Sequence, residues 1–492
     1  MDISKQLFQP ATKPSTPAFV PAAPHRSSLS AAARRFVQNK ASVTAALIIA
    51  ILLLFSLLTP LLSPYTVGFR DGYYRTMPPI FARSSRLSGP QAVADYYRSI
   101  GAEWGSSSVK SVNSQEKNED TGLYYYNLSV DAYDKVGFQY VDMSETEFHA
   151  LQAYQNATGQ QVCYPVPKNY STFYLAVSSS ANLWYELSDE SPYSTGESAH
   201  HNTNGETVFV ANYLQAEPDG SYASLRLEKD PGTWVYGVKN QTGYRCRVLY
   251  SAYYQYKHGV APRYLFGTNQ HGQDILVNLA SGARLSFLLA LGVSTINLLI
   301  GVLYGAVEGY YGGKLDLTME RISDILSAIP FIVVATLFQL HLASQVGAVP
   351  SLLFSFVLTG WIGIASRVRS QFYRFKNAEH VLCARTLGAS DQRIIFTHIL
   401  PNAIGTIITS SVLLIPGVIF SESMLSYLGI VNFESNNLTS IGTMLSSGRQ
   451  YLSTYPHILL FPAVFIALLE ISFNLLGNGL RDAFNPAMQA AE

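Results

Sequence analysis

Few residue patterns in this chain are of the kinds that carry out covalent chemistry. The motif GxxxxGK[ST], whose loop cradles nucleotide phosphates, does not occur, and the nearest stretch, Gly312-Gly313-Lys314, continues with Leu315. No GxSxG motif and no Ser/His/Asp arrangement is apparent. We therefore predict that the chain is not an enzyme, has no ATPase site and binds no cofactor itself. Any energy source must then lie on a partner.

The three cysteines, Cys163, Cys246 and Cys383, form no CxxC pair, and no Cys/His cluster has the spacing of a zinc site. A metal site is therefore not expected. Cys163 and Cys246 both fall in a polar segment that we place outside the membrane below, where a disulfide is chemically allowed. The sequence leaves open whether these two residues pair.

The segment 378–402 has the residue types and order of a helix–turn–helix. Residues 378–387 suit a helix, and Gly388 is the residue type that ends a helix in the left-handed conformation. Ser390 can cap the following helix, with Asp391 in its first turn.

Small residues in the same segment, Ala384, Gly388 and Ala389, leave a surface that another protein can approach closely. Leu400-Pro401 then leads into an apolar stretch. On composition alone, the favoured interpretation is an ordinary loop between two membrane helices. The alternative is a docking site for a partner.

One acid, Glu470, interrupts an otherwise apolar stretch over residues 457–476. A charged side chain at the centre of a membrane helix costs roughly 2.5–3.5 kcal/mol on insertion scales, so it usually faces the bundle interior or a water-filled cavity. Glu470 could hold a hydroxyl or amide on a neighbouring helix, or it could lie in a translocation path and favour a positively charged group. Asn474 lies one helical turn further on and would share its face.

These residues must be positioned by membrane helices. The hydrophobic fraction is 48% and the charged fraction is 13%, against roughly 25% charged residues in soluble domains. Charge is nearly absent from residues 41–69 and from long stretches within 285–480, whereas 70–284 has the composition of a soluble domain. The formal net charge is zero, which gives no reason to expect a nucleic-acid partner.

We predict a mostly α-helical, polytopic membrane protein with six transmembrane helices. The first is uncleaved, because its apolar run is long enough to span and lies far from the chain start. Residues 325–366 contain no charged side chain and are too long for one helix, so a turn is expected at 345–350. The six predicted helices cover 42–62, 285–307, two stretches within 325–366, 404–420 and 457–476.

The distribution of Lys and Arg predicts the orientation. The N-terminal tail is basic, and the loop 429–455 carries only Arg449. Both termini are therefore expected in the cytoplasm of a multi-pass protein of the bacterial cytoplasmic (inner) membrane. The segment 367–393, also predicted to be cytoplasmic, carries Arg367, Arg369, Arg374, Lys376, Arg385 and Arg393.

Four parts follow from this distribution. Residues 1–40 form a cytoplasmic tail, 41–63 the first helix, 64–262 an inserted extracytoplasmic domain, and 263–492 a core with the other five helices. The inserted domain is predicted to be a strand-rich α+β domain. It has alternating stretches such as Thr207-Val-Phe-Val-Ala, bounded by Asp-Gly and Pro-Gly turns.

Several segments together resemble the permease family of dipeptide, oligopeptide and nickel ABC importers, specifically its C-type subunit. The resemblance covers residues 30–64 and 260–487. Asn269 and Gln273 replace the acid and the arginine of the family's GTDxxGRD segment, and Asn478 replaces an Asp. The segments that carry the resemblance are Phe266-Gly-Thr-Asn-Gln-His-Gly-Gln-Asp-Ile275, Ser281-Gly-Ala-Arg-Leu-Ser286, Gly309-Tyr-Tyr-Gly-Gly313 with Asp316, Arg321, Asp324 and Pro330, Glu422-Ser-Met-Leu-Ser-Tyr-Leu-Gly429, and Asn474-Leu-Leu-Gly-Asn-Gly-Leu-Arg-Asp482.

The segment 378–401 resembles the EAA loop of these importers, through which the permease contacts its ATPases. Leu382 and Cys383 stand where the family pattern has Glu and Ala. The resemblance implies that the loop couples the chain to an ATPase. The residues expected to do so are Glu379, Ala384, Gly388, Ala389, Ser390, Leu400 and Pro401.

The resemblance also implies a type I importer fold and a set of partners. These are a second homologous permease, two ATPase subunits that hold ATP and magnesium, an extracytoplasmic substrate-binding protein, a peptide substrate and membrane lipid. Glu470 and Asn474 become candidates for the translocation path. The chain would do no covalent chemistry.

Two other functions share some of these sequence features. The same machinery could import nickel or another small solute, in which case His or Met might line the path. His341 and His457 lie near helix ends, where single histidines are more often interfacial than ligands. A membrane receptor or sensor would use the inserted domain to bind a ligand, but it would need a cytoplasmic output domain. The few residues after Leu480 leave no room for one.

Overall fold

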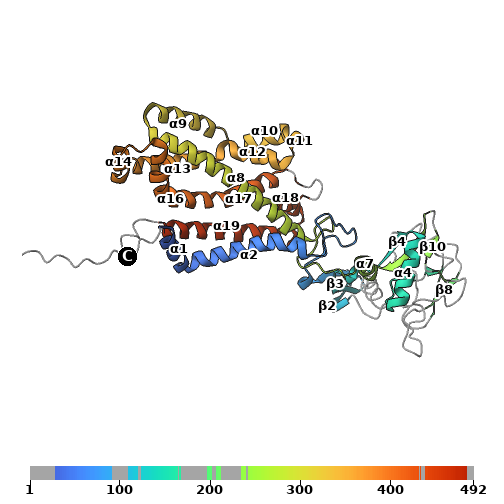
Figure 1. Cartoon of the computed structure of the whole chain (residues 1–492). Coiled ribbons are helices and arrows are strands. Elements are labelled where there is room, and N and C mark those ends of the chain that lie inside the picture. Colours follow the sequence, from blue (N-terminus) through green and yellow to red (C-terminus); the bar gives the residue numbers. More distant parts are fainter. Residues whose placement is uncertain are drawn as a thin grey trace, which may run out of the picture.

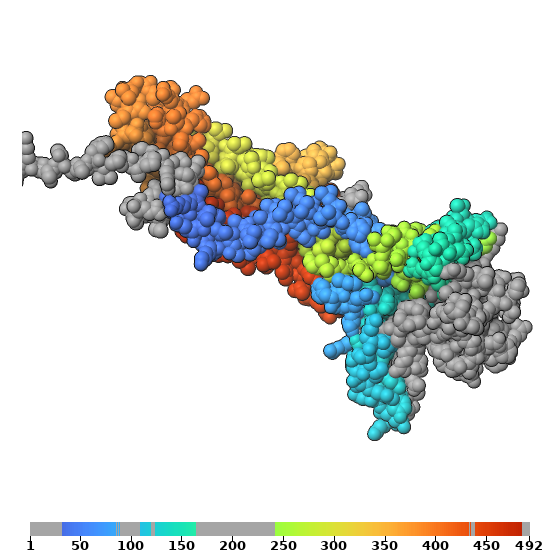
Figure 2. Space-filling view, turned by 60° about the horizontal axis from the view of Figure 1, so that its bottom comes forward, coloured from blue at the N-terminus to red at the C-terminus, as the bar shows by residue number. Residues whose placement is uncertain are grey.

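The computed structural model describes residues 28–90, 109–119, 124–164, 166–167, 197–201, 207–211, 234–235, 237–239, 242–431, 433 and 438–484. Within these residues a bundle of long helices lies at one end of the molecule and a strand-containing region projects from the other (Figures 1 and 2). The mostly α-helical fold with an inserted strand-containing region is as the sequence predicts.

Five helical stretches in the described chain are long and apolar enough to cross a membrane, and a bent pair of helices makes a sixth. Each stretch extends beyond the predicted apolar run, because polar residues that flank the run also belong to the helix. Three of the five are single helices, and the other two consist of consecutive helical elements. The five stretches are α2 (Lys40–Leu62), α8 (Ile275–Tyr311), α12 with α13 (Ala348–Gly360 and Ile362–Phe375), α15 to α17 (Asp391–Arg393, then the π-helix η5 Ile394–Ile399, α16 Leu400–Val412 and α17 Leu414–Tyr427), and α19 (His457–Ala483).

The third span differs from the prediction of a continuous helix within 325–366. It consists of α9 (Gly313–Ser327) and α10 (Phe331–His341), which meet at an angle of 70°. Pro330 lies at the break, where it has no N–H to donate and disfavours the helical conformation of the residue before it. The predicted turn near residue 347 is present, with Gly347 at φ 92° between α11 (Ala343–Val346) and α12.

Glycines let α8 and α13 pack with their backbones close together. A Cβ built at Gly301 would lie 2.7 Å from the Ile364 Cβ, and one at Gly309 would lie 2.6 Å from the Phe372 Cβ. Gly305, between them, would overlap the backbone of Ala365. Since Gly301, Gly305 and Gly309 recur every four residues, they form one stripe along α8, a common arrangement where membrane helices meet.

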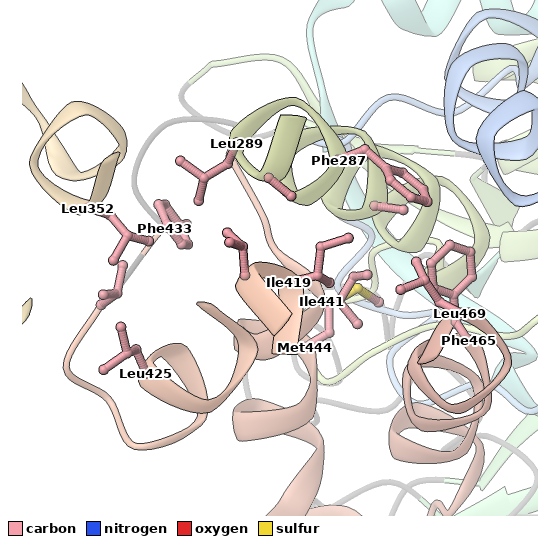
Figure 3. Packing of buried hydrophobic residues seen from close by; sticks show 14 of the residues in the cluster. Phe287, Leu289, Leu352, Ile419, Leu425, Phe433, Ile441, Met444, Phe465 and Leu469 are labelled. Atoms are coloured by element: carbon pink, nitrogen blue, oxygen red, sulfur yellow. The ribbon is translucent and has the colours of Figure 1, made fainter. Parts of the chain in front are cut away.

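The core of the bundle lies among α8, α17, α19 and the short helix α18 (Ile441–Gly448). Figure 3 shows Phe287, Ile419, Ile441 and Leu469 packed together in this core. Leucines and isoleucines on the outer face of α2 stay exposed, as expected for side chains that face lipid.

A buried polar cluster ties three of these helices together near the core. The Glu422 carboxylate, 1% exposed, accepts hydrogen bonds from the Ser286 hydroxyl at 2.8 Å and the Ser426 hydroxyl at 3.0 Å. Ser440 lies against the backbone of Gly282 and caps α18. The Glu422-Ser-Met-Leu-Ser-Tyr-Leu-Gly429 motif therefore has a structural role in this chain, because its acid is satisfied internally.

The projecting region contains two main sheets. One has the order β1-β3-β2 (Ser84–Pro90, Tyr124–Asp131 and Val109–Lys117), and the other has the order β10-β11-β4 (Gly237–Lys239, Tyr244–Leu249 and Phe138–Met143), with β5 (Cys163–Tyr164) also paired to β11. Cys163 pairs with Val248, two residues from Cys246 on the same face, and both cysteines are buried. Hydrogen bonding with Cys246 and burial raise the pKa of the Cys163 thiol. The other described elements are α1 (Ser28–Gln38), η2 (Ile80–Ala82), η3 (Asp134–Val136), α4 (Glu145–Thr158), β6 (Val166–Pro167), β7 (Glu197–His201), β8 (Thr207–Ala211), β9 (Trp234–Val235), α7 (Tyr250–His258), α14 (Glu379–Thr386) and η6 (Arg449–Tyr451).

A tyrosine-rich core joins this region to the helical bundle. Buried Asp71 accepts hydrogen bonds from the Tyr250 hydroxyl at 2.8 Å and from the Tyr74 N–H at 3.1 Å. Thr268, just before α8, donates to the Tyr74 carbonyl and accepts from the Met77 N–H. Burial raises the pKa of Tyr250 and keeps it neutral. Residues 65–77 are therefore fixed on the chain that leads into α8.

Candidate coupling site and transport path

The segment 378–402 folds locally as its sequence predicts. The helix α14 ends in a pair of reversed hydrogen bonds, from the Ala389 N–H to the Ala384 carbonyl and from the Gly388 N–H to the Arg385 carbonyl, both at 3.0 Å. This is the Schellman arrangement, and Gly388 adopts the left-handed φ of 82° that it requires. The Ser390 side chain then accepts from the Arg393 N–H and caps α15.

The helix beyond the turn is irregular for a local reason. Residues 394–399 form a π-helix, η5, immediately before Leu400 and Pro401. Pro401 cannot donate a backbone hydrogen bond, and a wider turn accommodates its ring without ending the helix. The Asn402 side chain donates to the His398 carbonyl at 2.7 Å and approaches the His380 ring of α14 at 3.4 Å.

The turn presents an apolar tip. Leu387 is 88% exposed, and no heavy atom of the described chain lies within 4 Å of a Cβ built at Gly388. Ala384, in contrast, is buried, and Ala389 packs against a buried cluster that includes Ile394. Of the predicted coupling residues, Gly388 therefore lies on the outer surface, while Ala384 and Ala389 support the turn from inside. Glu379 is exposed at the start of α14.

The sequence did not indicate Leu387 as a candidate site residue. It is the C-cap residue that follows α14, and no local motif indicates whether an apolar residue at that position is buried or exposed. Its exposure is a property of the fold. An exposed leucine beside an open glycine forms a small apolar projection of the kind that a partner can cover.

The loop 378–402 is held to α8 by Tyr310, a residue to which the sequence alone assigns no role. The Tyr310 hydroxyl, near the end of α8, donates to the Asp391 carboxylate, and the Arg385 guanidinium lies 5.8 Å from the centre of the Tyr310 ring. Tyr310 thus touches the residues on both sides of the turn. Figure 1 shows α14 and α1 at the end of the bundle farthest from the strand-containing region.

A cluster of charges lies beside this junction. Arg369 of α13 makes paired hydrogen bonds to Asp316 at 2.6 and 2.9 Å and to Glu320 at 2.8 and 3.1 Å, both on α9. Buried Glu308 of α8 lies 3.6 Å from the same guanidinium. The Tyr373 hydroxyl donates to Asp316 at 2.6 Å. The sequence singled out Asp316 by resemblance, but not Arg369 as its partner.

Glu470 and Asn474 do not interact through their side chains. The Asn474 amide donates to the Glu470 backbone carbonyl at 2.9 Å and is exposed on α19. Glu470 is half-buried, and its Oε1 has no hydrogen-bond partner among the described residues. Neither a hydroxyl nor an amide of a neighbouring described helix satisfies that oxygen, so its role as a path residue stays a prediction.

Within the described residues, no group of three His, Cys, Asp or Glu side chains is arranged to hold a metal ion. The geometry is that of a multi-pass membrane protein, with a capped apolar turn at one end of its helices. Comparison with known proteins makes the class specific.

Residues 297–490 match the family described as "Binding-protein-dependent transport system inner membrane component", and residues 27–79 match "N-terminal TM domain of oligopeptide transport permease C". The oligopeptide transport system permease protein OppC of Bacillus subtilis is 41% identical over 46% of this chain and 72% of its own length. The dipeptide transport system permease protein DppC of the same organism is 39% identical over 46% and 69%. The Escherichia coli K12 OppC is 36% identical over 45% and 72%.

A solved structure of the MetNI methionine ABC transporter aligns with a TM-score of 0.36 and 17% identity over 42% of this chain and 96% of that chain, a likeness too distant to add to the assignment. The sequence relatives define the class, which is the inner-membrane permease subunit of an ABC importer. The chain belongs to the binding-protein-dependent transport permease family, in the branch that contains the OppC and DppC permeases. It is thus a multi-pass inner-membrane protein of a system that includes ATPase and substrate-binding components.

Proposed function

We propose that this chain is a permease subunit that moves di- or oligopeptides into the cell, with its own helices forming one half of the path. Its relatives named for oligopeptide and dipeptide transport support a peptide substrate over nickel or another small solute. A second homologous permease would supply the other half of the path. Two ATPases would supply ATP and magnesium, and an extracytoplasmic binding protein would deliver the peptide.

The observation that carries the coupling part of this proposal is the turn after α14. It combines an exposed Leu387, an open left-handed Gly388, and an anchor from Asp391 to Tyr310 of α8. An ATPase that covers this turn can displace it, and the displacement would reach a long membrane helix directly. Alternating access would then follow from rigid-body movement of packed helices.

The same site supports a proposed orientation in the membrane. The start of α2 and the end of α19 lie together, because a Cβ built at Gly479 would overlap Ser42. In Figure 1 these helix ends lie at the α14 end of the bundle. With the ATPases in the cytoplasm, both helix ends face the cytoplasm and the strand-containing region faces outward.

The test is the variant Gly388→Asp, studied in the complex that this chain forms with its partner subunits. A side chain at this position enters the covered surface and strains the left-handed backbone. We expect ATP-driven uptake of radiolabelled trialanine to be lost, while the variant remains in the membrane.

A matched control separates backbone strain from docking. Gly259 also follows a helix, has φ 72° and has no described heavy atom within 4 Å of a built Cβ, but it lies in the projecting region. Gly259→Asp should retain uptake. Normal uptake by Gly388→Asp, or equal loss in both variants, would contradict the assignment of the turn.

A further inference from the structure

The corner between α8 and α9 is a joint made of two glycines. Gly312 has φ 68° and ψ −162°, a region of backbone space that is essentially limited to glycine. Gly313 follows at φ 62°, and no described heavy atom lies within 4 Å of a Cβ built there. The corner has no side chain of its own, and a Cβ built at Gly312 would lie 3.2 Å from the Lys376 Nζ and 3.4 Å from the Tyr373 hydroxyl.

Among the residues that the structure describes, two polar ties hold α9 to the rest of the bundle. The Tyr304 hydroxyl of α8 donates to the Met319 carbonyl at 2.7 Å. The other tie is the cluster around Arg369, whose guanidinium fork binds both Asp316 and Glu320, one turn apart on α9. Since Arg–carboxylate pairs with two parallel hydrogen bonds fix geometry as well as charge, Arg369 sets the angle of α9.

The helix that carries Arg369 leads directly into the coupling loop. Only residues 376–378 separate α13 from α14. Lys376 donates to the Gly309 carbonyl of α8 at 3.2 Å and lies 3.9 Å from the centre of the Tyr373 ring. Together with the Tyr310–Asp391 hydrogen bond, these contacts join the loop, the end of α8 and the end of α13 into one packed unit.

We propose that Arg369 is a positioning residue that transmits displacement of the coupling loop to the bent pair α9–α10, with the Gly312–Gly313 joint as the pivot. The proposal rests on the proposed function of the loop. When an ATPase moves the packed unit, the Arg369 fork carries the first turns of α9 with it. The apolar remainder of α9 and α10 then changes its angle to the bundle.

The charge balance of the cluster explains why a simple loss of Arg369 would have two effects. Glu308, Asp316 and Glu320 face Arg369, and Lys376 is the other cation nearby. Removing the arginine breaks the link to α9 and also leaves buried carboxylates without a countercharge, which is strongly unfavourable. The experiment must separate these effects.

The measured quantity is the number of radiolabelled trialanine molecules transported per ATP hydrolysed, in proteoliposomes that contain the whole complex. For Arg369→Gln we expect this ratio to fall, because the guanidinium fork that links α13 to α9 is lost. Arg369→Lys keeps the charge but not the guanidinium fork. Its transport ratio should lie between that of the unchanged protein and that of Arg369→Gln. Arg367→Gln is the control: Arg367 is exposed on the same helix and has no acidic partner among the described residues, so it should match the unchanged protein.

The double variant Arg369→Gln/Asp316→Asn distinguishes a linking role from a role in charge balance. It removes a buried negative charge together with the arginine, so assembly with the ATPases should improve relative to the single variant. The transport ratio should nevertheless stay low, because the link to α9 is still absent.

Return of the ratio to that of the unchanged protein in the double variant would overturn the proposal, and so would an unchanged ratio in Arg369→Gln. Failure of the unchanged complex to couple ATP hydrolysis to trialanine uptake would instead contradict the proposed function. The two failures are therefore distinguishable in one set of vesicles.

Discussion

The close packing of α8 on α13 makes a quantitative prediction for Gly305→Ala. A Cβ at this position would lie 2.9 Å from the Ala365 carbonyl carbon and 2.9 Å from the Val368 Cβ, and it would overlap the Ala365 oxygen. Carbon atoms pack best at about 3.5–4.0 Å, so the two helices must separate by roughly 1 Å. Because the obstacle is backbone, no rotamer change can relieve it.

The same helix supplies a matched control. At Gly292, the nearest atom to a built Cβ is the Leu353 Cδ1 at 3.9 Å, an ordinary contact. Both substitutions gain about 0.5–1 kcal/mol from the higher helix propensity of alanine, so that gain cancels between them. The difference is the overpacking penalty, which is typically about 1–3 kcal/mol.

The assay is thermal unfolding of the purified protein in detergent, followed by intrinsic fluorescence. For a domain of about 150–250 residues, such as the helical core, 1 kcal/mol corresponds to about 2–4 °C in melting temperature. Gly305→Ala should therefore melt about 2–12 °C below Gly292→Ala. We expect Gly292→Ala to melt at or slightly above the unchanged protein. Equal melting temperatures for the two variants would refute the close contact between α8 and α13.

Three further predictions concern the path, the projecting region and the orientation. Glu470→Gln keeps the size and hydrogen bonding of the side chain but removes its charge. If Glu470 attracts the amino terminus of a peptide, uptake of free trialanine should slow by more than uptake of N-acetylated trialanine. Equal rates for both peptides in both proteins would remove Glu470 from the path. Because β6 pairs with β9 and brings Pro167 opposite Trp234, residues 168–233 can be replaced by the two-residue turn Asn-Gly. If the projecting region docks the binding protein, uptake should fall while assembly with the ATPases is kept. Full uptake would mean that this stretch only covers the external mouth of the path. Native Cys383 is exposed in the loop 378–402 and should not react with an impermeant maleimide in sealed right-side-out vesicles. A cysteine introduced by Asn113→Cys on exposed β2 should react. The reverse pattern would contradict the proposed topology.

Local signals in the sequence determined the membrane helices of this protein and the ends of the helices around Gly388. Membrane helices were predictable because the hydrophobicity of a run of about 20 residues decides insertion almost independently of distant contacts. Gly388 and Ser390 were predictable for a similar reason: a left-handed helix end and a helix cap depend on the residue itself and its immediate neighbours. The motif set also identified the family before any geometry was available.

The tertiary structure decided the features that depend on distant residues. Arg369 finds Asp316 across 53 positions, and Tyr310 finds Asp391 across 81, and neither pairing follows from local composition. The charge-free stretch 325–366 predicts two helices, but the first of them is part of a bent pair that begins earlier, at Gly313, with a charged face held by Arg369. The exposure of Leu387 likewise depends on how α14 packs. The physical reason is that helix formation and membrane insertion are set by neighbouring residues, whereas ion pairing, burial and helix angles are set by which helices meet.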